Sequence, residues 1–139
     1  MWWGSSPRWV RWVTAGYVIG FVEGMCAHIR DLFDHRWHAY DYASAPLRVF
    51  DYSLLLLDPL AAFLAVEGRR SGLILAAAIM AADLPSNWWE NRRWIQQDPV
   101  RIVEYPGLLG IVTLTVFVVA TFAGLWREFG KNHRAPQPV

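Results

Sequence analysis

Four apolar blocks, each long enough to cross a lipid bilayer, constrain the fold of this 139-residue chain more than any other feature. They cover approximately residues 12–29, 47–66, 72–89 and 107–126. A helix needs about 20 apolar residues to cross the ~30 Å hydrocarbon core, whereas a barrel strand needs only about 10. A backbone in lipid must also satisfy its own hydrogen bonds. The blocks therefore predict an all-α, multi-pass integral membrane four-helix bundle in the lipid bilayer.

The composition agrees with a membrane location. Hydrophobic residues make up 55% of the chain and aromatic residues 15%, more than a soluble domain of this size can bury. Arginines and tryptophans collect between the blocks, as in the aromatic belts of membrane proteins. We predict a single domain over residues 1–130 and a disordered tail over 131–139. The predicted helices cover approximately residues 9–30, 47–66, 72–90 and 107–127, with a tight hairpin at 67–71.

Charge and cysteine content exclude several kinds of protein. The net charge of +1 leaves no basic stripe, so we expect no nucleic-acid partner. The single Cys26 excludes an intrachain disulfide and a cysteine-rich zinc site. Tryptophans and arginines alternate at the start of the chain, which is not the pattern of a signal peptide. Seven basic residues on the side of the termini against six on the other favour cytoplasmic termini.

Three carboxyl groups lie in the middle of apolar blocks. Glu23 is in the first block, Asp58 in the second and Asp83 in the third. Each carboxylate at the centre of a bilayer costs about 2.5–3.5 kcal/mol. We therefore expect all three to face the interior of the bundle, where they meet each other or line a cavity.

Two further acids and an amide share faces with these residues. Asp51 precedes Asp58 by seven positions, and Asn87 and Glu90 follow Asp83 by four and seven. Residues at such spacings lie on one side of a helix. The sequence thus places an acidic face on each of the second and third helices.

These acids permit two interpretations. They can hold the helices together as hydrogen-bonded carboxyl groups, which needs only one or two partners. They can also form an internal pocket that passes protons to and from an apolar substrate. Pro59 and Pro85 favour the pocket, because a proline inside a membrane helix frees a carbonyl group and bends the axis.

A second group of polar residues follows the first block. His28, Asp31, His35 and His38 would form one stripe if the first helix continued beyond the membrane. Three imidazoles and a carboxylate can hold zinc or iron. The alternative is a solvated segment in which arginines pair with the acids, and we expect no bound metal. His28 lies deep enough to belong to the pocket instead.

The layout resembles the EXPERA family, four-helix membrane modules that include the emopamil-binding sterol isomerase and the sigma-2 receptor. The family has an aspartate followed after seven positions by a glutamate in the third helix, which here is DLPSNWWE, from Asp83 to Glu90. In the second helix an acid, an apolar run and a proline correspond to FDYSLLLLDP, with Asp51 and Pro59.

The first helix of the family has a histidine followed by an acid, for which His28 and Asp31 are the nearest equivalents. This chain departs from the family in two respects. Glu23 and Asp58 are additional, and TLTVFVV occupies the place where the isomerase has an asparagine and a tryptophan. This last departure argues against sterol isomerisation itself.

The resemblance implies a terpenoid- or sterol-like apolar ligand and an acid/base enzyme without a cofactor, either an olefin isomerase or a proton-initiated cyclase. The candidate catalytic residues are Asp83, Glu90, Asp51, Asp58, Glu23 and His28. The candidate substrate-binding residues are Asn87, Trp88, Trp89, Tyr52 and Phe21. Two alternatives stay open: a lipid- or sterol-binding module without turnover, and a metal-dependent enzyme built on the histidine stripe. Association into a homo-oligomer is left open as well.

Overall fold

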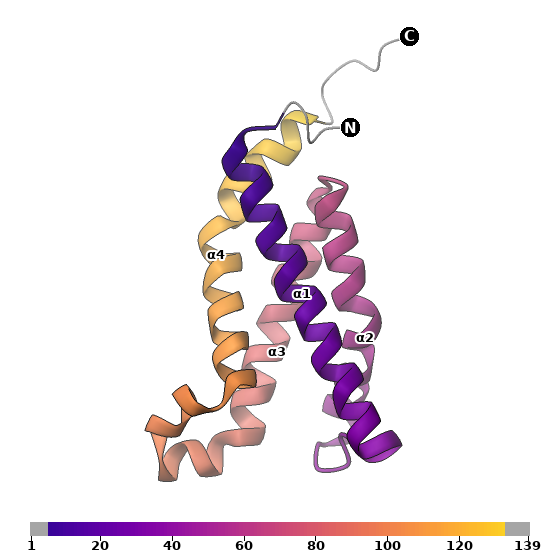
Figure 1. The fold of residues 1–139 in the computed structure, drawn as a ribbon, viewed down its shortest axis with the longest axis vertical. Helices are drawn as coiled ribbons and strands as arrows, with labels where there is room; N and C mark the ends of the chain where they lie inside the picture. The colour runs from indigo at the N-terminus through magenta and orange to yellow at the C-terminus, as the bar shows by residue number, and fades with distance from the viewer. Residues whose placement is uncertain (1–5, 133–139) are drawn as a thin grey trace.

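The computed structural model describes residues 6–132, and in that range it contains four long helices and no strand (Figure 1). The helices are α1 (Arg8–His35), α2 (Ala45–Val66), α3 (Arg70–Gln97) and α4 (Pro106–Asn132). Two short 3₁₀ helices, η2 (Arg36–His38) and η3 (Pro99–Glu104), lie in the connections. The all-α class is confirmed. The predicted tail began too early, because Lys131 and Asn132 still belong to α4, and residues 133–139 lie outside the described range.

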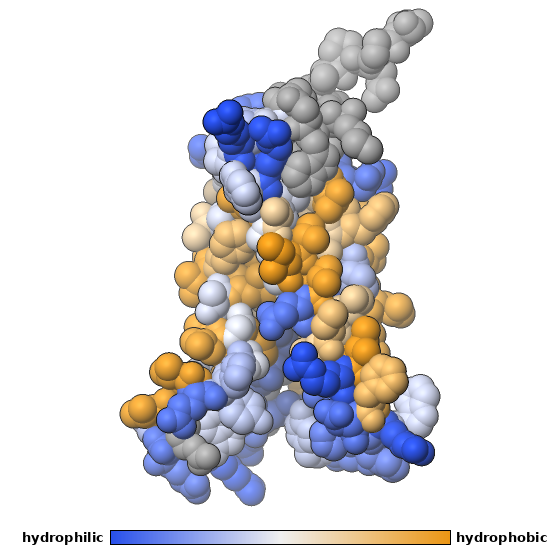
Figure 2. All heavy atoms as spheres, viewed as in Figure 1, coloured by the Kyte–Doolittle hydropathy of each residue, from blue (hydrophilic) through white to orange (hydrophobic). Residues whose placement is uncertain are grey.

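The two ends of the bundle differ. At one end, α1 begins, α4 ends and α2 turns into α3 (Figure 1). We call this the closed end. At the other, which we call the open end, the α1–α2 pair and the α3–α4 pair diverge (Figure 1). The space-filling view shows a notch between two hydrophilic lobes at this end (Figure 2). Helix α1 packs mainly on α2 and touches α4 much less, which agrees with this divergence.

Three of the four helices are long and apolar enough to cross a membrane, namely α1, α2 and α4. Helix α3 has 28 residues but does not belong to this group, because polar residues interrupt its second half. It nevertheless runs the length of the bundle beside the others (Figure 1). Apolar side chains cover the middle of the molecule and hydrophilic ones both ends (Figure 2). The protein is therefore an integral membrane bundle whose third helix is more polar than the sequence blocks suggested.

The α2–α3 hairpin is closed by a glycine turn. Gly68 has a φ of 66°, a left-handed conformation that costs glycine little. Its N–H donates to the Ala65 carbonyl and the Arg69 N–H to the Leu64 carbonyl, the pattern of a Schellman motif. Gly72 then lies directly against the backbone of residues 64 and 65. The predicted tight hairpin is present, with only residues 67–69 between the helices.

Both α1 and α3 extend beyond their predicted ends. Helix α1 continues to His35 and stops where Arg36 adopts a φ of 56°. Helix α3 continues to Gln97 and stops just before Pro99, since a residue that precedes proline avoids the helical conformation. The hydropathy of the blocks marked where lipid contact ends, whereas a helix continues as long as its backbone hydrogen bonds are satisfied.

All four helices contribute to the core. Its fully buried members include Tyr17 from α1, Leu54 from α2, Leu73 from α3 and Leu125 from α4. The Tyr17 hydroxyl donates to the Val118 carbonyl at 3.3 Å, which ties α1 to α4. A smaller apolar cluster around Tyr40 is formed by residues of the α1–α2 connection, and side chains of α1 and α2 pack against it.

Candidate functional site

The acidic face of α2 points into the bundle. Asp51 and Asp58 are each only 4% exposed, and they continue the buried stripe that includes Leu54, Ala61 and Ala65. Their spacing of seven residues puts both on the same side of the helix. One carboxyl oxygen of Asp51, Oδ2, is buried without a hydrogen-bond partner. The sequence correctly placed both acids in the interior.

Asp58 is accommodated by a glycine of α1. A β-carbon added at Gly24 would lie 2.7 Å from Asp58 Oδ2, closer than two such atoms approach. Gly24 is the third glycine of a stripe with Gly16 and Gly20, whose added β-carbons would meet Phe117 and Leu114 of α4. Small residues at this spacing let membrane helices approach closely. The sequence analysis missed this stripe, although the spacing of four residues was readable from the sequence.

The acidic face of α3 meets that of α2. Asp83 is 6% exposed, and its Oδ1 accepts a hydrogen bond of 2.9 Å from the Asn87 side chain. The same amide group donates to the Asp83 carbonyl at 3.1 Å. Glu90, one helical turn beyond Asn87, is partly buried, and its Oε1 has no hydrogen-bond partner. Asn87 thus orients Asp83, while Glu90 lies at the edge of the site.

The carboxyl groups of the two helices lie close enough to interact through their charges. Asp51 interacts with Glu90 and Asp83, and Asp58 interacts with Asp83. The ion pairs found among the described side chains lie elsewhere: His38 with Asp41, Arg48 with Asp41, and Lys131 with Glu128. Adjacent carboxyl groups without a cation cannot all be ionised at once, because like charges repel each other. We call Asp51, Asp58, Asp83 and Glu90 the acid cluster.

A tyrosine borders the acid cluster on the open side. Tyr40 is 3% exposed, and its hydroxyl lies 2.7 Å from His28 Nδ1. Burial raises the pKa of Tyr40, and the charges of Asp31 and Asp51 raise it further. Its hydroxyl therefore keeps its proton. Tyr40 was absent from the predicted site, because nothing in the sequence distinguishes this residue of the connection from its neighbours.

Two predicted aromatic residues fall in different surroundings. Tyr52 contacts Tyr40, with ring centroids 5.0 Å apart, and its hydroxyl donates to the Trp37 carbonyl at 2.8 Å. Phe21 is buried and packs near Tyr17, with ring centroids 6.2 Å apart. Tyr52 therefore belongs to the surroundings of Tyr40, and Phe21 to the apolar core.

Glu23 does not point into the bundle. Its side chain is exposed on α1, although the next residue, Gly24, faces Asp58. Successive residues differ by about 100° around a helix, so the contact of Gly24 turns Glu23 away. The expectation that all three mid-block acids face the interior is wrong for Glu23.

Trp88 and Trp89 also lie outside the acid cluster. They are 46% and 61% exposed and line an outer groove between α3 and α4. They are separated from Asn87 by only one or two positions, but the helix directs them to a different side. The structure therefore places these two candidate substrate-binding residues in a groove without carboxyl groups, and their role in substrate binding stays a prediction.

The histidine stripe is interrupted. Arg36, with its positive φ, ends α1 between His35 and His38, and both of these histidines are exposed. His28 is engaged by Tyr40, and His38 by Asp41. Among the described residues, no three histidine, cysteine or acidic side chains are arranged to hold a metal ion. The geometry does not support the metal-dependent alternative.

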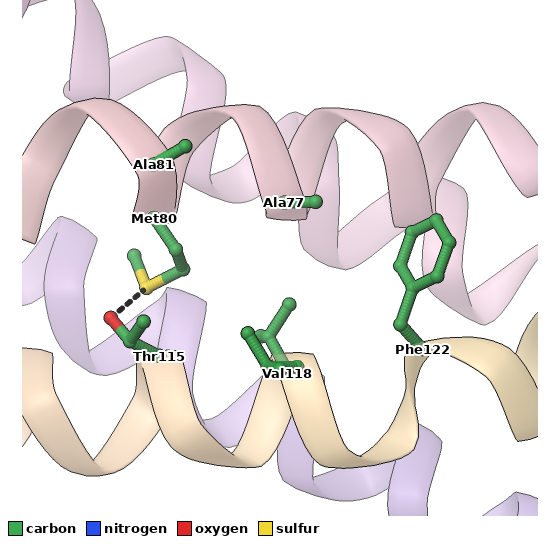
Figure 3. A pocket seen from close by; sticks show the side chains of 7 residues that line it. Ala77, Met80, Ala81, Thr115, Val118 and Phe122 are labelled. Atoms are coloured by element: carbon green, nitrogen blue, oxygen red, sulfur yellow. Dashed lines mark hydrogen bonds between the residues drawn. The ribbon is translucent and has the colours of Figure 1, made fainter.

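Two hollows lie along α3 and α4. The first, of about 310 Å³, is bordered by apolar side chains and Thr115, whose hydroxyl lies 3.6 Å from the Met80 sulfur (Figure 3). The second is the groove beside Trp88 and Trp89. Neither hollow is lined by a carboxyl group. The acid cluster is thus separate from both hollows.

Comparison with known proteins finds no matching family model, no matching curated protein and no matching solved structure. The likeness to the EXPERA family therefore stays a prediction that rests on the residues quoted for it.

Proposed function

We propose that the protein is a membrane-embedded acid/base enzyme that acts on a terpenoid- or sterol-like olefin and requires no cofactor. The observation that carries this proposal is the acid cluster. Three almost completely buried carboxyl groups converge from two helices, and no cation within the described part of the chain pairs with them. Such an arrangement is costly in lipid, which favours a functional role. The resemblance stated from the sequence supports the same class of substrate.

Asp83 is the proposed acid. Asn87 occupies its Oδ1, so the transferable proton of the protonated form is on Oδ2. Transfer of this proton to one carbon of a double bond leaves a carbocation on the other. Carboxylates and aromatic rings close to such a cation stabilise it.

Glu90 is the proposed base, with Asp51 and Asp58 as carboxyl groups that share the proton with Asp83. Removal of a proton from a carbon next to the cation forms the double bond at a new position, so atoms and charge balance without an oxidant. If a second double bond of the same substrate attacks the cation first, the product is a ring. The same residues therefore serve an olefin isomerase and a proton-initiated cyclase.

One observation favours an alternative, a lipid-binding module without turnover. The hollow in Figure 3 is apolar and has no titratable side chain, so a ligand bound there would meet no acid. The two functions differ in whether the ligand exchanges a proton with the protein.

Deuterium incorporation separates the two functions. The full chain in lipid nanodiscs is incubated in D₂O with a linear polyprene and an unsaturated sterol, and the recovered lipids are analysed by mass spectrometry. We expect deuterated product from one of these classes and a loss of activity of about 10²-fold in Asp83→Asn, the usual scale for a general acid. Asp98→Asn, at the exposed end of the same helix, is the matched control and should retain activity.

Bound lipid that never gains deuterium would support the binding module. Full activity in both Asp83→Asn and Glu90→Gln would show that the acid and base are wrongly assigned. Because Asp83→Asn keeps the shape of the side chain, its thermal stability should stay close to that of the parent protein.

A further inference from the structure

The outer groove between α3 and α4 combines an apolar wall with a cation. It encloses about 670 Å³ near the open end of the bundle. Its lining consists of Leu84, Pro85, Trp88, Trp89, Arg92, Gln96 and Val112. Apolar and aromatic side chains make up most of this set, and Arg92 is its only charged member.

Arg92 is held in place from one side. Its guanidinium lies 4.0 Å from the centroid of the Trp89 ring, and its Nη1 donates to the Trp89 carbonyl. Within residues 6–132, no carboxylate lies within ion-pair distance of this group. An arginine side chain has five N–H donors in a planar array that suits phosphate oxygens. Arg92 therefore presents further donors and an uncompensated positive charge to the groove.

The groove runs along the second half of α3. Leu84 and Gln96 are separated by twelve residues of helix, which corresponds to about 18 Å along the axis. The exposed Trp88 and Trp89 lie between them, and such residues are typical of the level of lipid headgroups. Helix α3 runs from the closed end to the open end (Figure 1), so Leu84, near the middle of this helix, lies toward the middle of the bundle, and Arg92 and Gln96 lie toward the open end.

We propose that this groove is a binding site for one anionic phospholipid. The phosphate group binds at Arg92 and Gln96, while an acyl chain lies along Leu84, Pro85 and Val112. Charge complementarity selects this occupant: a zwitterionic lipid brings no net charge to Arg92. The proposal does not depend on the acid/base function, because the groove contains no carboxyl group.

Lipid retention tests the site. The full chain is purified, exchanged into equimolar phosphatidylglycerol and phosphatidylcholine, and analysed by native mass spectrometry. An arginine near an anionic membrane surface contributes enough attraction for a preference of about five-fold. We expect phosphatidylglycerol to be retained over phosphatidylcholine by about this factor, and Arg92→Gln to bring the ratio close to one. Gln96→Glu should also lower it, by adding a negative charge where the phosphate binds.

Arg93→Gln is the matched control. Arg93 is exposed, is the next residue on the same helix and does not line the groove, so its removal should leave the preference unchanged. If Arg92→Gln and Arg93→Gln lowered the preference for phosphatidylglycerol equally, the preference would come from general surface charge, and the proposed site would be wrong. Three other results would overturn it too: equal retention of the two lipids by the parent protein, replacement of phosphatidylglycerol by a free fatty acid, and a dimer whose formation excludes lipid from the groove.

Discussion

Arg70 at the closed end of the bundle and the acid cluster toward the open end differ in how their charged groups are satisfied. At the closed end, Arg70 of α3 donates from Nε to the Trp126 carbonyl at 3.0 Å and lies 4.6 Å from the Trp126 ring. Gly130 makes room for the guanidinium, since an added β-carbon there would overlap it. At the open end, Asp51 Oδ2 and Glu90 Oε1 are buried without hydrogen-bond partners.

This difference distinguishes charged groups that stabilise the fold from carboxyl groups that are available for proton transfer. A charged group that is fully hydrogen-bonded and packed stabilises the helices that it joins, whereas an unsatisfied buried carboxyl group is a cost to the fold. Arg70 therefore helps to hold the bundle together, whereas the acid cluster contains groups that are free to react. Removal of the Arg70 guanidinium should therefore lower thermal stability, and removal of a carboxyl group of the acid cluster should change activity.

The largest effect is expected at the closed end, from Gly72→Ala. The new β-carbon would lie 2.7 Å from the backbone of both Leu64 and Ala65, which cannot move without opening the hairpin. We expect a loss of about 3 kcal/mol, the upper range for overpacking, seen as a lower Tm in detergent. Gly110→Ala is the control, because a β-carbon there would meet nothing within 4 Å. Equal Tm values for the two variants would contradict the tight hairpin.

A smaller loss, of about 2 kcal/mol, is expected from Gly24→Ala, since its β-carbon meets a side-chain oxygen of Asp58 that can shift. This variant tests whether the packing at the acid cluster depends on the glycine. In the double variant Gly24→Ala/Asp58→Ala the clash is absent, so the two changes should not add, with a coupling above about 0.5 kcal/mol. Additive changes in Tm would show that α1 and α2 do not meet at this point.

Arg70→Gln tests how much the Arg70 side chain contributes to the stability of the closed end. It removes a hydrogen bond to a carbonyl group and the contact with the Trp126 ring, for an expected loss of about 1.5 kcal/mol. Arg69→Gln, which changes an exposed residue next to it, should change the free energy of unfolding by no more than about 0.5 kcal/mol and leave the Tm close to the parent value. If both variants melt alike, the closed end does not owe its stability to Arg70.

The smallest change in stability is expected at the open end, from Asp51→Asn. The substitution keeps the shape of the side chain and removes a buried carboxyl group that pairs with no cation in the described part of the chain, so the Tm should stay the same or rise slightly. Its activity in the deuterium assay should nevertheless fall, because Asn cannot carry the shared proton. A drop in Tm as large as that of Arg70→Gln would mean that Asp51 stabilises the fold, and the division between the two ends would fail.

Much of the architecture could be predicted from the sequence. The apolar blocks indicated four helices, and the five residues between the second and third blocks required a hairpin. The spacing of Asp51 and Asp58, and that of Asp83 and Asn87, correctly predicted acidic faces turned inward. These predictions succeeded because helical periodicity is a local property, and a buried charge is costly wherever it lies in lipid.

The orientation of α1 could not be predicted in the same way. Apolar residues occur around most of this helix, so hydropathy does not show which side meets its neighbours. Close contacts at Gly16, Gly20 and Gly24 decide it, and as a consequence Glu23 points outward. A glycine has almost no hydropathy signal, although it determines how closely two helices approach.

The sequence by itself determined a helical membrane bundle with an acidic face on α2 and on α3, because block length and periodicity depend only on residues close together in the chain. Only the tertiary structure decided that these faces meet, that Tyr40 reaches His28, and that Trp88 and Trp89 line an outer groove. Those outcomes depend on the rotation of each helix about its axis and on the divergence of the two helix pairs. Both are set by contacts between residues far apart in the sequence, which no local pattern records.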